Sequence, residues 1–394
     1  MKPRRYQLRK EAVGVALRHP WIFRDHLSSA ASVFRDGEPL RLVDGSNRVV
    51  GYGFYEASGA IAIRVVRRGP APPDAAWLRG QLTAAVARRA ELATRTDAIR
   101  LVHGESDGIP AVVVDRFADT LVVSSYAAGA DAFARYAARV LDPRSGIAGG
   151  DAINPIVGPA HHVVLRPAHL RQGPAEPART LRGSPPELVH ITENGLSLAV
   201  DLATGQKTGT YLDLRGLRRE VAAAPLTGCR VLNLFAYSGM LGRAAEVAGA
   251  TTIVQVDASE RALAFAAAHH AGDLAKHAFV AADVFAWLPE FTAEPFDLII
   301  VDPPAMTSKA PQVPSVLAAY RKLYRAAARL VRPGGALVAA CCTSRIEREV
   351  FHQTVRDALG GPFTLHREIP PEPDHPVGFV QADYLKIAWW VRSA

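Results

Sequence analysis

The chain has 394 residues, which is more than one ordinary domain contains and predicts two or three domains. Hydrophobic residues make up 49% of the chain and charged residues 21%, which excludes a protein that is disordered throughout. The formal net charge of +8 at pH 7 allows nucleic acid or another polyanion as a partner without proving one.

Cysteine use and the N-terminus predict the compartment. Cys229, Cys341 and Cys342 are the three cysteines, and such a set cannot build a disulfide framework and fits a reducing environment. No apolar stretch follows the charges of residues 1–14, and no segment reaches about 18 uninterrupted apolar residues. We therefore expect a cytoplasmic protein with neither an export signal nor a membrane span.

The N-terminal residues predict a small, basic, β-rich domain. Within residues 39–67, three runs rich in Val, Ile and Tyr are separated by Asp-Gly-Ser-Asn and Ser-Gly-Ala turns. Trp21 and Phe23 precede these runs, and we expect both to pack in the core. Residues 1–70 contain 13 Lys and Arg against 6 Asp and Glu, so almost the whole net charge of the chain lies in this domain. A Gly-Pro-Ala-Pro-Pro run at 69–73 predicts its end.

The next segment predicts a separate α+β domain. Expected helices cover residues 75–93 and 130–140, and expected strands cover 111–114, 120–124 and 163–166. The last of these strands lies in a stretch rich in Gly and Pro, residues 146–186, which leads toward the third domain.

From residue 188 onward, short apolar strands alternate with helices, as in a doubly wound parallel sheet that is covered on both faces. Expected strands are 230–235, 252–256, 279–282, 297–301 and 336–342, and expected helices are 244–248, 261–270 and 316–331. The predicted fold class is α/β, with a Rossmann-like domain at 188–394 preceded by a β-rich domain at 1–70 and an α+β domain at 71–187.

Ligands of such sheets bind at the carboxyl ends of the strands, and polar residues follow the strands here. Asp257, Asp283, Asp302 and Cys342 end the second to fifth expected strands. Asp257 suits the hydroxyls of a ribose and Asp283 the amino group of an adenine, although an Asp after a strand is equally often a helix N-cap. The loop at 235–239 lacks the three-glycine turn that holds a pyrophosphate. Adenosine recognition without phosphate recognition favours S-adenosylmethionine (SAM) over NAD or ATP.

Several motifs resemble one family of methyltransferases. They are Asn233-x-Phe235-x-Tyr237-Ser238-Gly239, Asp302-Pro303-Pro304, the run from Glu193 to Asp213, His19-Pro20-Trp21-Ile22-Phe23, and Gly104-Glu105-Ser106-Asp107-Gly108-Ile109-Pro110. Over nearly its whole length the chain resembles the bacterial class I SAM-dependent methyltransferases that form 5-methylcytosine in large-subunit ribosomal RNA. The resemblance implies a PUA domain, a middle α+β domain and a Rossmann-like methyltransferase domain, with RNA as partner and SAM as cofactor.

The resemblance also implies the residues of the site. Those expected at the cofactor are Asn233, Phe235, Tyr237, Ser238, Gly239, Asp257, Asp283 and Asp302. Asp302 is also expected to face the target base, and Cys342 aligns with the cysteine of the family's Ser-Cys-Ser motif. The chain departs from the family at Met240, Met306 and Cys341, where Gly, an aromatic residue and Ser are usual.

Methylation of cytosine carbon 5 needs a nucleophile from the enzyme, because this carbon is itself a poor nucleophile. A thiolate that adds to carbon 6 makes carbon 5 enamine-like. Asp302 is the candidate to absorb charge at ring nitrogen 3 and the exocyclic amine, while the base that removes the carbon 5 proton is not assigned. Neighbouring side chains at a strand end point to opposite faces, so only one of the two cysteines can face the cleft. The resemblance to the family motif favours Cys342 as the nucleophile, and Cys341 is then expected to be packed.

An RNA substrate must also be held by its phosphates, and its target base must be exposed. Arg321, Arg325 and Arg329 are expected on one face of a helix that also carries Lys322 and Arg332. Such a charge run is usually a solvated face, and we prefer that interpretation. The excess charge of residues 1–70 predicts instead that the N-terminal domain holds the RNA.

Two other functions stay open. A methyltransferase acting on another RNA position or on protein would use Asp302 for a nitrogen target, but nitrogen methylation needs no covalent nucleophile such as Cys342. A non-catalytic RNA-binding ribosome assembly factor would be expected to lose the acidic strand ends, and Asp257, Asp283 and Asp302 are all present. We expect no metal site, and a homodimer stays open.

Overall fold

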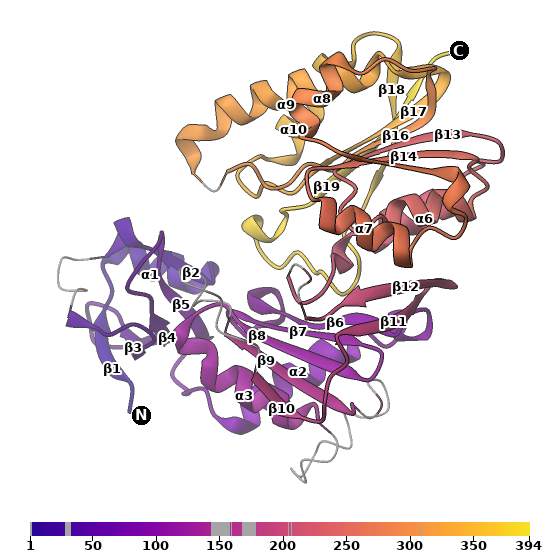
Figure 1. The fold of residues 1–394 in the computed structure, drawn as a ribbon. Helices are drawn as coiled ribbons and strands as arrows, with labels where there is room; N and C mark the ends of the chain where they lie inside the picture. Colours follow the sequence, from indigo (N-terminus) through magenta and orange to yellow (C-terminus); the bar gives the residue numbers. More distant parts are fainter. Residues whose placement is uncertain are drawn as a thin grey trace. The chain divides into compact units, whose positions relative to one another are not determined.

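The computed structural model describes residues 2–27, 33–142, 158, 160–167, 179–203, 205, 207–307 and 309–394 (Figure 1). Two compact units divide the chain. Unit 1 comprises Met1–Gly195, Val200–Leu212 and Pro373–Phe379, and unit 2 comprises Leu196–Ala199, Asp213–Glu372 and Val380–Ala394. The division into three domains at 1–70, 71–187 and 188–394 stays our proposal.

The first sheet of unit 1 has the strand order β1-β3-β4-β5-β2. Its elements are β1 (Arg4–Gln7), α1 (Lys10–Arg18), β2 (Trp21–Phe23), β3 (Pro39–Val43), β4 (Val49–Tyr55) and β5 (Ile61–Arg68). The three strands expected within residues 39–67 are thus confirmed. Gly53 is required in β4, because a Cβ at this position would lie 2.4 Å from the Arg64 carbonyl oxygen of β5.

The side chains of β2 alternate between the core and the surface. Ile22 is completely buried, whereas Trp21 and Phe23 are half-buried. The prediction that Trp21 and Phe23 pack in the core is therefore wrong, because Ile22 occupies the inward face of the strand. The Trp21 indole N–H donates to Glu105 Oε1 at 2.8 Å, and its ring centroid lies 4.8 Å from that of Phe379.

The second sheet of unit 1 has the order β10-β9-β8-β7-β6. Its strands are β6 (Ala98–His103), β7 (Val112–Phe117), β8 (Thr120–Ser125), β9 (His162–Pro167) and β10 (Arg179–Arg182), and helices α2 (Ala75–Ala87) and α3 (Asp131–Val140) share their core. The expected strands are confirmed, while the first helix ends six residues earlier than its expected end at 93. Most of the stretch 146–186 lies outside the described residues. β11 (Leu188–Glu193) and β12 (Leu196–Asp201) form a separate hairpin.

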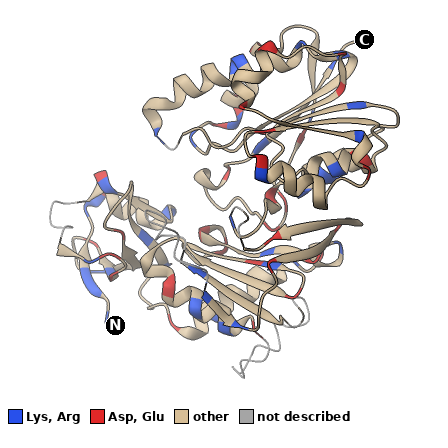
Figure 2. Ribbon diagram, viewed as in Figure 1, with Lys and Arg blue, Asp and Glu red and all other residues tan. Residues whose placement is uncertain are grey.

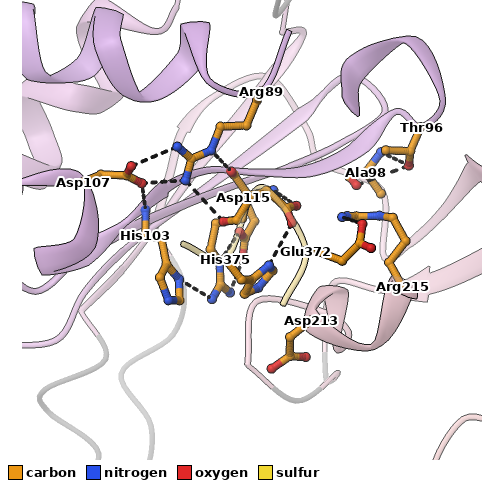
Figure 3. A network of polar contacts seen from close by, with 12 residues as sticks. Arg89, Thr96, Ala98, His103, Asp107, Asp115, Asp213, Arg215, Glu372 and His375 are labelled. Carbon is orange, nitrogen blue, oxygen red and sulfur yellow. Dashed lines mark hydrogen bonds and ion pairs between the residues drawn. The ribbon is translucent and has the colours of Figure 1, made fainter. Parts of the chain in front are cut away.

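A buried network of charged groups joins parts of unit 1 that lie far apart in the sequence, residues 89–115 and Asp374 (Figure 3). Arg89, which is completely buried, donates to both carboxylate oxygens of Asp107 at 2.9 and 2.6 Å. Arg100 makes the same two contacts with Asp115, at 2.8 and 2.9 Å. The Asp374 carboxylate accepts from the Arg100 backbone N–H at 3.0 Å, and the Asp374 carbonyl oxygen accepts from Arg89 at 3.2 Å. The network pairs its buried charges, which is the condition under which an interior tolerates them.

Unit 2 contains a sheet with the order β15-β14-β13-β16-β17-β19-β18. Its strands are β13 (Arg230–Leu234), β14 (Thr252–Asp257), β15 (His277–Ala281), β16 (Phe296–Val301), β17 (Val331–Cys341), β18 (Phe363–Ile369) and β19 (Lys386–Arg392). The first five are parallel and confirm the expected α/β class, and the direction of winding reverses between β13 and β16. The sequence reasoning missed β18 and β19, which are antiparallel.

Helices cover both faces of this sheet, with α6 and α7 on one face and α8, α9 and α10 on the other (Figure 1). They are α6 (Met240–Val247), α7 (Glu260–His269), α8 (Val284–Glu290), α9 (Val313–Ala328) and α10 (Arg348–Leu359), and α5 (Arg215–Ala222) packs beside α6. Among the described residues, no helix combines the length and apolar character needed to cross a bilayer.

The basic helix expected at 316–331 begins and ends three residues earlier than predicted. α9 ends before Arg329, whose guanidinium donates to the backbone carbonyl oxygens of Leu288, Pro289 and Phe291. Arg332 lies in β17 and forms an ion pair with Asp297. Arg321, Lys322 and Arg325 remain exposed on α9, in agreement with the solvated-face interpretation.

A buried histidine in unit 2 connects the loop after β13 to β12. His270, directly after α7, is 2% exposed, and its Nδ1 contacts the Ser238 carbonyl oxygen. Because a carbonyl oxygen can only accept, Nδ1 carries the proton of the neutral ring and donates to Ser238. Nε2 therefore accepts from the Ala199 backbone N–H at 3.0 Å, and it also lies 3.1 Å from the Ala199 carbonyl oxygen. Burial lowers the pKa of His270 to about 4, which keeps the ring neutral at pH 7.

We expect Arg89→Met to lower the stability of the protein by about 3 kcal/mol, because it takes the main partner from the buried Asp107 carboxylate. Urea unfolding followed by circular dichroism measures this as the apparent free energy of unfolding. Arg95→Met is the matched control, since Arg95 and Glu91 are 42% and 91% exposed and lie 3.6 Å apart. The control should change stability by less than about 1 kcal/mol, and equal losses in both variants would contradict the assignment.

His270 makes stability depend on pH. Above pH 6.5 the ring is neutral in both the folded and the unfolded chain, whereas below it the unfolded chain binds a proton that the folded chain excludes. Stability is therefore lost as the pH falls from 6.5 toward about 4, by about 3 kcal/mol in all.

We expect His270→Gln to be less stable than the parent protein at pH 7.5 but to lose less stability between pH 6.5 and 4.5. Thermal unfolding at a series of pH values measures the two slopes. His269→Gln, at the exposed neighbouring position, should keep the parental slope. If the stability of the His270→Gln variant and of the parent fell equally steeply with pH, another group would be responsible for the loss of stability at acid pH.

Candidate active site

The predicted site residues lie at one edge of the sheet of unit 2. Asp257 is the last residue of β14, while Asp302 and Cys342 directly follow β16 and β17. Asp283 lies two residues beyond β15, and the loop at 235–239 follows β13. Because these five strands are parallel neighbours, their carboxyl ends meet at the same edge. The structure thus brings the strand ends together as the sequence predicted.

The loop after β13 has an unusual backbone. Phe235, Tyr237 and Gly239 have φ angles of 61°, 47° and 75°, in the left-handed region that residues other than glycine rarely adopt. At Gly239 a side chain is also excluded by space, since a Cβ would lie 2.6 Å from the Ala266 Cβ. Such strained backbone is found where a ligand or a catalytic group must be approached closely.

Asp257 shapes this loop. Its Oδ2 accepts from the Tyr237 backbone N–H at 2.8 Å, and its Oδ1 accepts from the Ser259 N–H at 2.9 Å. Each carboxylate oxygen has a second lone pair, and the side chain is half-buried. Asp257 can therefore hold the loop and still accept hydrogen bonds from a ligand.

Asp283 has a local structural role as well. It is the N-cap of α8, and its Oδ1 accepts from the Phe285 N–H at 2.9 Å. Phe285 is 36% exposed, and its ring centroid lies 5.4 Å from that of Phe235. The sequence reasoning missed Phe285, although an aromatic residue two positions after an expected adenine contact was an available signal. The two rings offer an apolar surface beside Asp283.

Asn233 lies beneath the loop. Its side chain is completely buried, and its Nδ2 donates to Gln255 Oε1 at 3.3 Å. Gln255 Nε2 in turn lies 3.0 Å from His277 Nδ1. The same glutamine touches the loop and α6, because a Cβ at Gly239 or Gly242 would lie 2.9 or 2.4 Å from Gln255 Oε1. The structure therefore places Asn233 in a support below the loop.

The two adjacent cysteines differ in their surroundings. Cys341 is completely buried among the apolar residues of one face of the sheet. Cys342 is half-buried, and its Sγ lies 3.5 Å from the carbonyl oxygen of Pro303, the residue after Asp302. The predicted packing of Cys341 is thus confirmed. Met306, where the family has an aromatic residue, is half-buried against the same core.

Two tyrosines of α9 hold the end of β17. Tyr324 donates to the Ala340 carbonyl oxygen at 2.7 Å, and the Tyr320 hydroxyl lies 3.3 Å from the Thr343 hydroxyl. Burial, and then the nearby Tyr320 and Cys341, raise the pKa of Tyr324. The pKa of Tyr320 is raised by burial and then by Cys341. Both phenols therefore remain protonated donors at neutral pH.

The arrangement fits SAM. The carboxylate at the end of β14 can accept hydrogen bonds from the hydroxyl groups of a ribose, and the Phe235 and Phe285 rings can contact an adenine. Gly239 allows the loop at 235–239 to pack closely against Ala266. The loop contains no three-glycine turn that could hold a pyrophosphate. A cofactor held here would lie at the same edge as Asp302 and Cys342.

Comparisons with known proteins agree with this fit. A family model described as S-adenosylmethionine-dependent methyltransferase matches residues 152–383, and a model described as PUA-like domain matches residues 8–68. A candidate SAM-dependent methyltransferase from Streptococcus mutans has a similar fold, with a TM-score of 0.81, 21% sequence identity and coverage of 98% of this chain and 100% of that one.

Curated proteins are similar over more than nine tenths of the chain. A ribosomal RNA large subunit methyltransferase of Deinococcus radiodurans is 33% identical over 395 residues, which cover 93% of this chain and 92% of that protein. The ribosomal RNA large subunit methyltransferase I of Klebsiella pneumoniae subsp. pneumoniae is 33% identical over 94% of this chain and 93% of its own. This chain therefore belongs to the SAM-dependent methyltransferase family with an N-terminal PUA-like domain, which includes these ribosomal RNA large subunit methyltransferases.

Proposed function

We propose that the protein methylates carbon 5 of a cytosine in large-subunit ribosomal RNA through a bond between Cys342 and carbon 6 of the base. The position of Cys342 carries this proposal. Its sulfur lies beside Pro303, one residue beyond Asp302, so a thiol and a carboxylate come from the ends of two neighbouring strands. A nitrogen methyltransferase has no use for such a thiol, and the names of the relatives support ribosomal RNA as the substrate.

In the proposed reaction, the Cys342 thiolate forms a bond to carbon 6, and the electrons of the 5,6 double bond make carbon 5 nucleophilic. Asp302 takes up the change in charge by hydrogen bonding to ring nitrogen 3 and the exocyclic amine. When bound, SAM supplies an electrophilic methyl group. A base then removes the carbon 5 proton, the double bond re-forms, and sulfur leaves with its electron pair as a thiolate. Tyr320 and Tyr324 are not candidates for this base, because burial keeps them protonated.

The cofactor contacts are part of the proposal. We assign the ribose hydroxyls to Asp257, and the adenine to Asp283 and to the rings of Phe235 and Phe285. The remaining contacts are assigned to Tyr237, Ser238, Gly239 and Asp302 at the same edge, with Asn233 supporting the loop from below.

We further propose that the PUA-like domain holds the RNA. Residues 1–70 carry a net charge of +7, and residues 191–394 carry equal numbers of basic and acidic side chains. Figure 2 shows the Lys and Arg residues of this part of unit 1 in blue. Arg9, Lys10 and Arg18, at the two ends of α1, are exposed, so their charges are available to phosphates.

We expect Cys342→Ala to abolish the covalent bond to RNA. Ribosomal RNA that contains 5-fluorocytidine traps the intermediate, because the fluorine on carbon 5 cannot be removed as a proton. The parent protein should form an adduct that survives denaturing electrophoresis, and Cys342→Ala should form none, with methyl transfer at least about 1000-fold slower. The matched control is Cys341→Ala, which should keep the adduct. An adduct in Cys342→Ala that is lost in Cys341→Ala would overturn the choice of nucleophile.

The substrate is tested in cells. Bisulfite sequencing of ribosomal RNA should reveal one cytosine that loses protection when the gene is deleted. The parent gene should restore that protection, and the Cys342→Ala gene should not. If no cytosine changes its status in the large-subunit RNA, the proposed substrate is wrong.

The RNA-binding role predicts a change in salt dependence. Arg9→Gln/Lys10→Gln/Arg18→Gln should weaken binding to a ribosomal RNA transcript and reduce the slope of log affinity against log salt by about 2. SAM affinity, measured by calorimetry, should not change. The control is Arg321→Gln/Lys322→Gln/Arg325→Gln on α9, which removes the same charge from unit 2. Equal losses of RNA affinity in both triple variants would contradict the assignment to the PUA-like domain.

A further inference from the structure

Four side chains form a row across the first sheet of unit 1. The strand register places Arg5 of β1 opposite Arg41 of β3, and Arg41 opposite Tyr52 of β4. Tyr52 in turn lies opposite Arg67 of β5. Residues directly opposite one another in neighbouring strands share a face of the sheet, so these four side chains lie side by side. With strands about 4.8 Å apart, the row is about 14 Å long.

The end of the row at β1 and β3 is open to solvent. Tyr6 and Leu42, which neighbour Arg5 and Arg41 in their strands, are buried in the core of this sheet. Side chains alternate between the two faces of a strand, so Arg5 and Arg41 project from the face opposite that core. Both arginines are exposed.

The other end of the row is fixed by neutral groups. Tyr52 is 8% exposed, and its hydroxyl donates to the Pro70 carbonyl oxygen at 3.1 Å. The half-buried Arg67 donates from Nη1 to the Pro72 carbonyl oxygen at 2.8 Å, and its guanidinium carbon lies 5.8 Å from the centroid of the Trp77 ring. These contacts hold the Arg67 guanidinium in place without neutralising it.

Carboxylates of the same domain pair with other arginines. Within the described residues, these ion pairs are Arg4 with Glu38, Arg48 with Asp44, and Arg64 with Glu56. Arg5 instead donates to neutral oxygens, Asn47 Oδ1 at 2.8 Å and Gln7 Oε1 at 3.0 Å. In the same part of the chain, no carboxylate forms an ion pair with Arg41 or Arg67. The positive charge of the row is therefore available to an anionic partner.

The row adjoins the exposed cations at the start of α1. The Leu8 N–H donates to the Val43 carbonyl oxygen at 2.8 Å, so the pairing of β1 with β3 continues one residue beyond the strand. Leu8 is buried, and the next residue, Arg9, has an extended backbone and is exposed. The alternation of side chains therefore places Arg9 on the same side as Arg5, next to Lys10.

We infer that Arg5, Arg41 and Arg67, here called the arginine row, bind phosphates of the RNA backbone. The inference rests on the proposed RNA-binding role of the PUA-like domain and identifies the face of its sheet that the RNA contacts. A guanidinium group suits a phosphate because its N–H groups form a planar fork that can donate two parallel hydrogen bonds. Since Tyr52 is buried, the row presents charge and no ring on which a base could stack. Its contacts would hold the RNA without reading its sequence.

The test compares two double variants with the same change in net charge. Arg5→Gln/Arg41→Gln removes two charges of the arginine row, and Arg4→Gln/Arg48→Gln removes two that carboxylates already pair. Binding of the full-length protein to a large-subunit ribosomal RNA transcript is measured between about 50 and 200 mM salt. We expect the row variant to bind about tenfold more weakly, with a slope of log affinity against log salt that is smaller by about 2. The Arg4→Gln/Arg48→Gln control should change affinity by less than about threefold.

A third variant separates charge from structure. Arg5→Lys/Arg41→Lys should restore the parental salt slope because it keeps both charges, while its affinity should stay below that of the parent because an ammonium lacks the fork. Thermal unfolding and SAM affinity should be the same in all variants and the parent, since the row lies outside the core of the sheet and outside unit 2.

Two results would overturn the inference. Equal losses of RNA affinity in the row variant and the Arg4→Gln/Arg48→Gln variant would mean that net charge alone acts. An unchanged RNA affinity in the row variant would indicate an acidic protein, and not RNA, as the partner of this face. The proposed role of the domain is tested separately by the Arg9→Gln/Lys10→Gln/Arg18→Gln variant. If that variant loses RNA affinity and the row variant does not, the PUA-like domain still holds RNA and only this inference fails.

Discussion

Parallel pairing of β13 with β14 on one side and β16 on the other is the constraint on which the candidate site depends. It brings the ends of these strands to one edge, so residues distant in sequence meet there. It also forces the chain to turn sharply after β13, where Phe235 and Tyr237 adopt positive φ angles. Strain of this kind costs about 1–3 kcal/mol per residue, and the hydrogen bond from the Tyr237 N–H to Asp257 helps to offset it.

Buried polar groups have a common role in both units, which is to hold segments that no regular element fixes. In unit 2, His270 holds the carbonyl group of Ser238, and the contact of Asn233 with Gln255 lies beneath the same loop. In unit 1, Arg89 binds both Asp107 and the backbone of Asp374, a residue from a late part of the chain. When one member of such a network is missing, the remaining buried polar groups lose their hydrogen-bond partners, and this lowers the stability of the fold. Each network therefore favours the one geometry in which all of its members are paired.

Side-chain identity and strand position were enough to predict which candidate residues lie at the strand ends. Asp257, Asp302 and Cys342 were predicted because each follows an apolar run that reads as a parallel strand. Phe285 was missed because its importance depends on the distance of its ring from Phe235, which the loop after β13 decides.

Local hydrophobic pattern and composition were enough to predict the fold class, the succession along the chain of strands that acidic residues follow, and the concentration of positive charge in residues 1–70. The three-dimensional packing was needed to show that Cys341 is enclosed while Cys342 is half-buried, and that Trp21 is not part of the core. Burial depends on which distant elements cover a side chain.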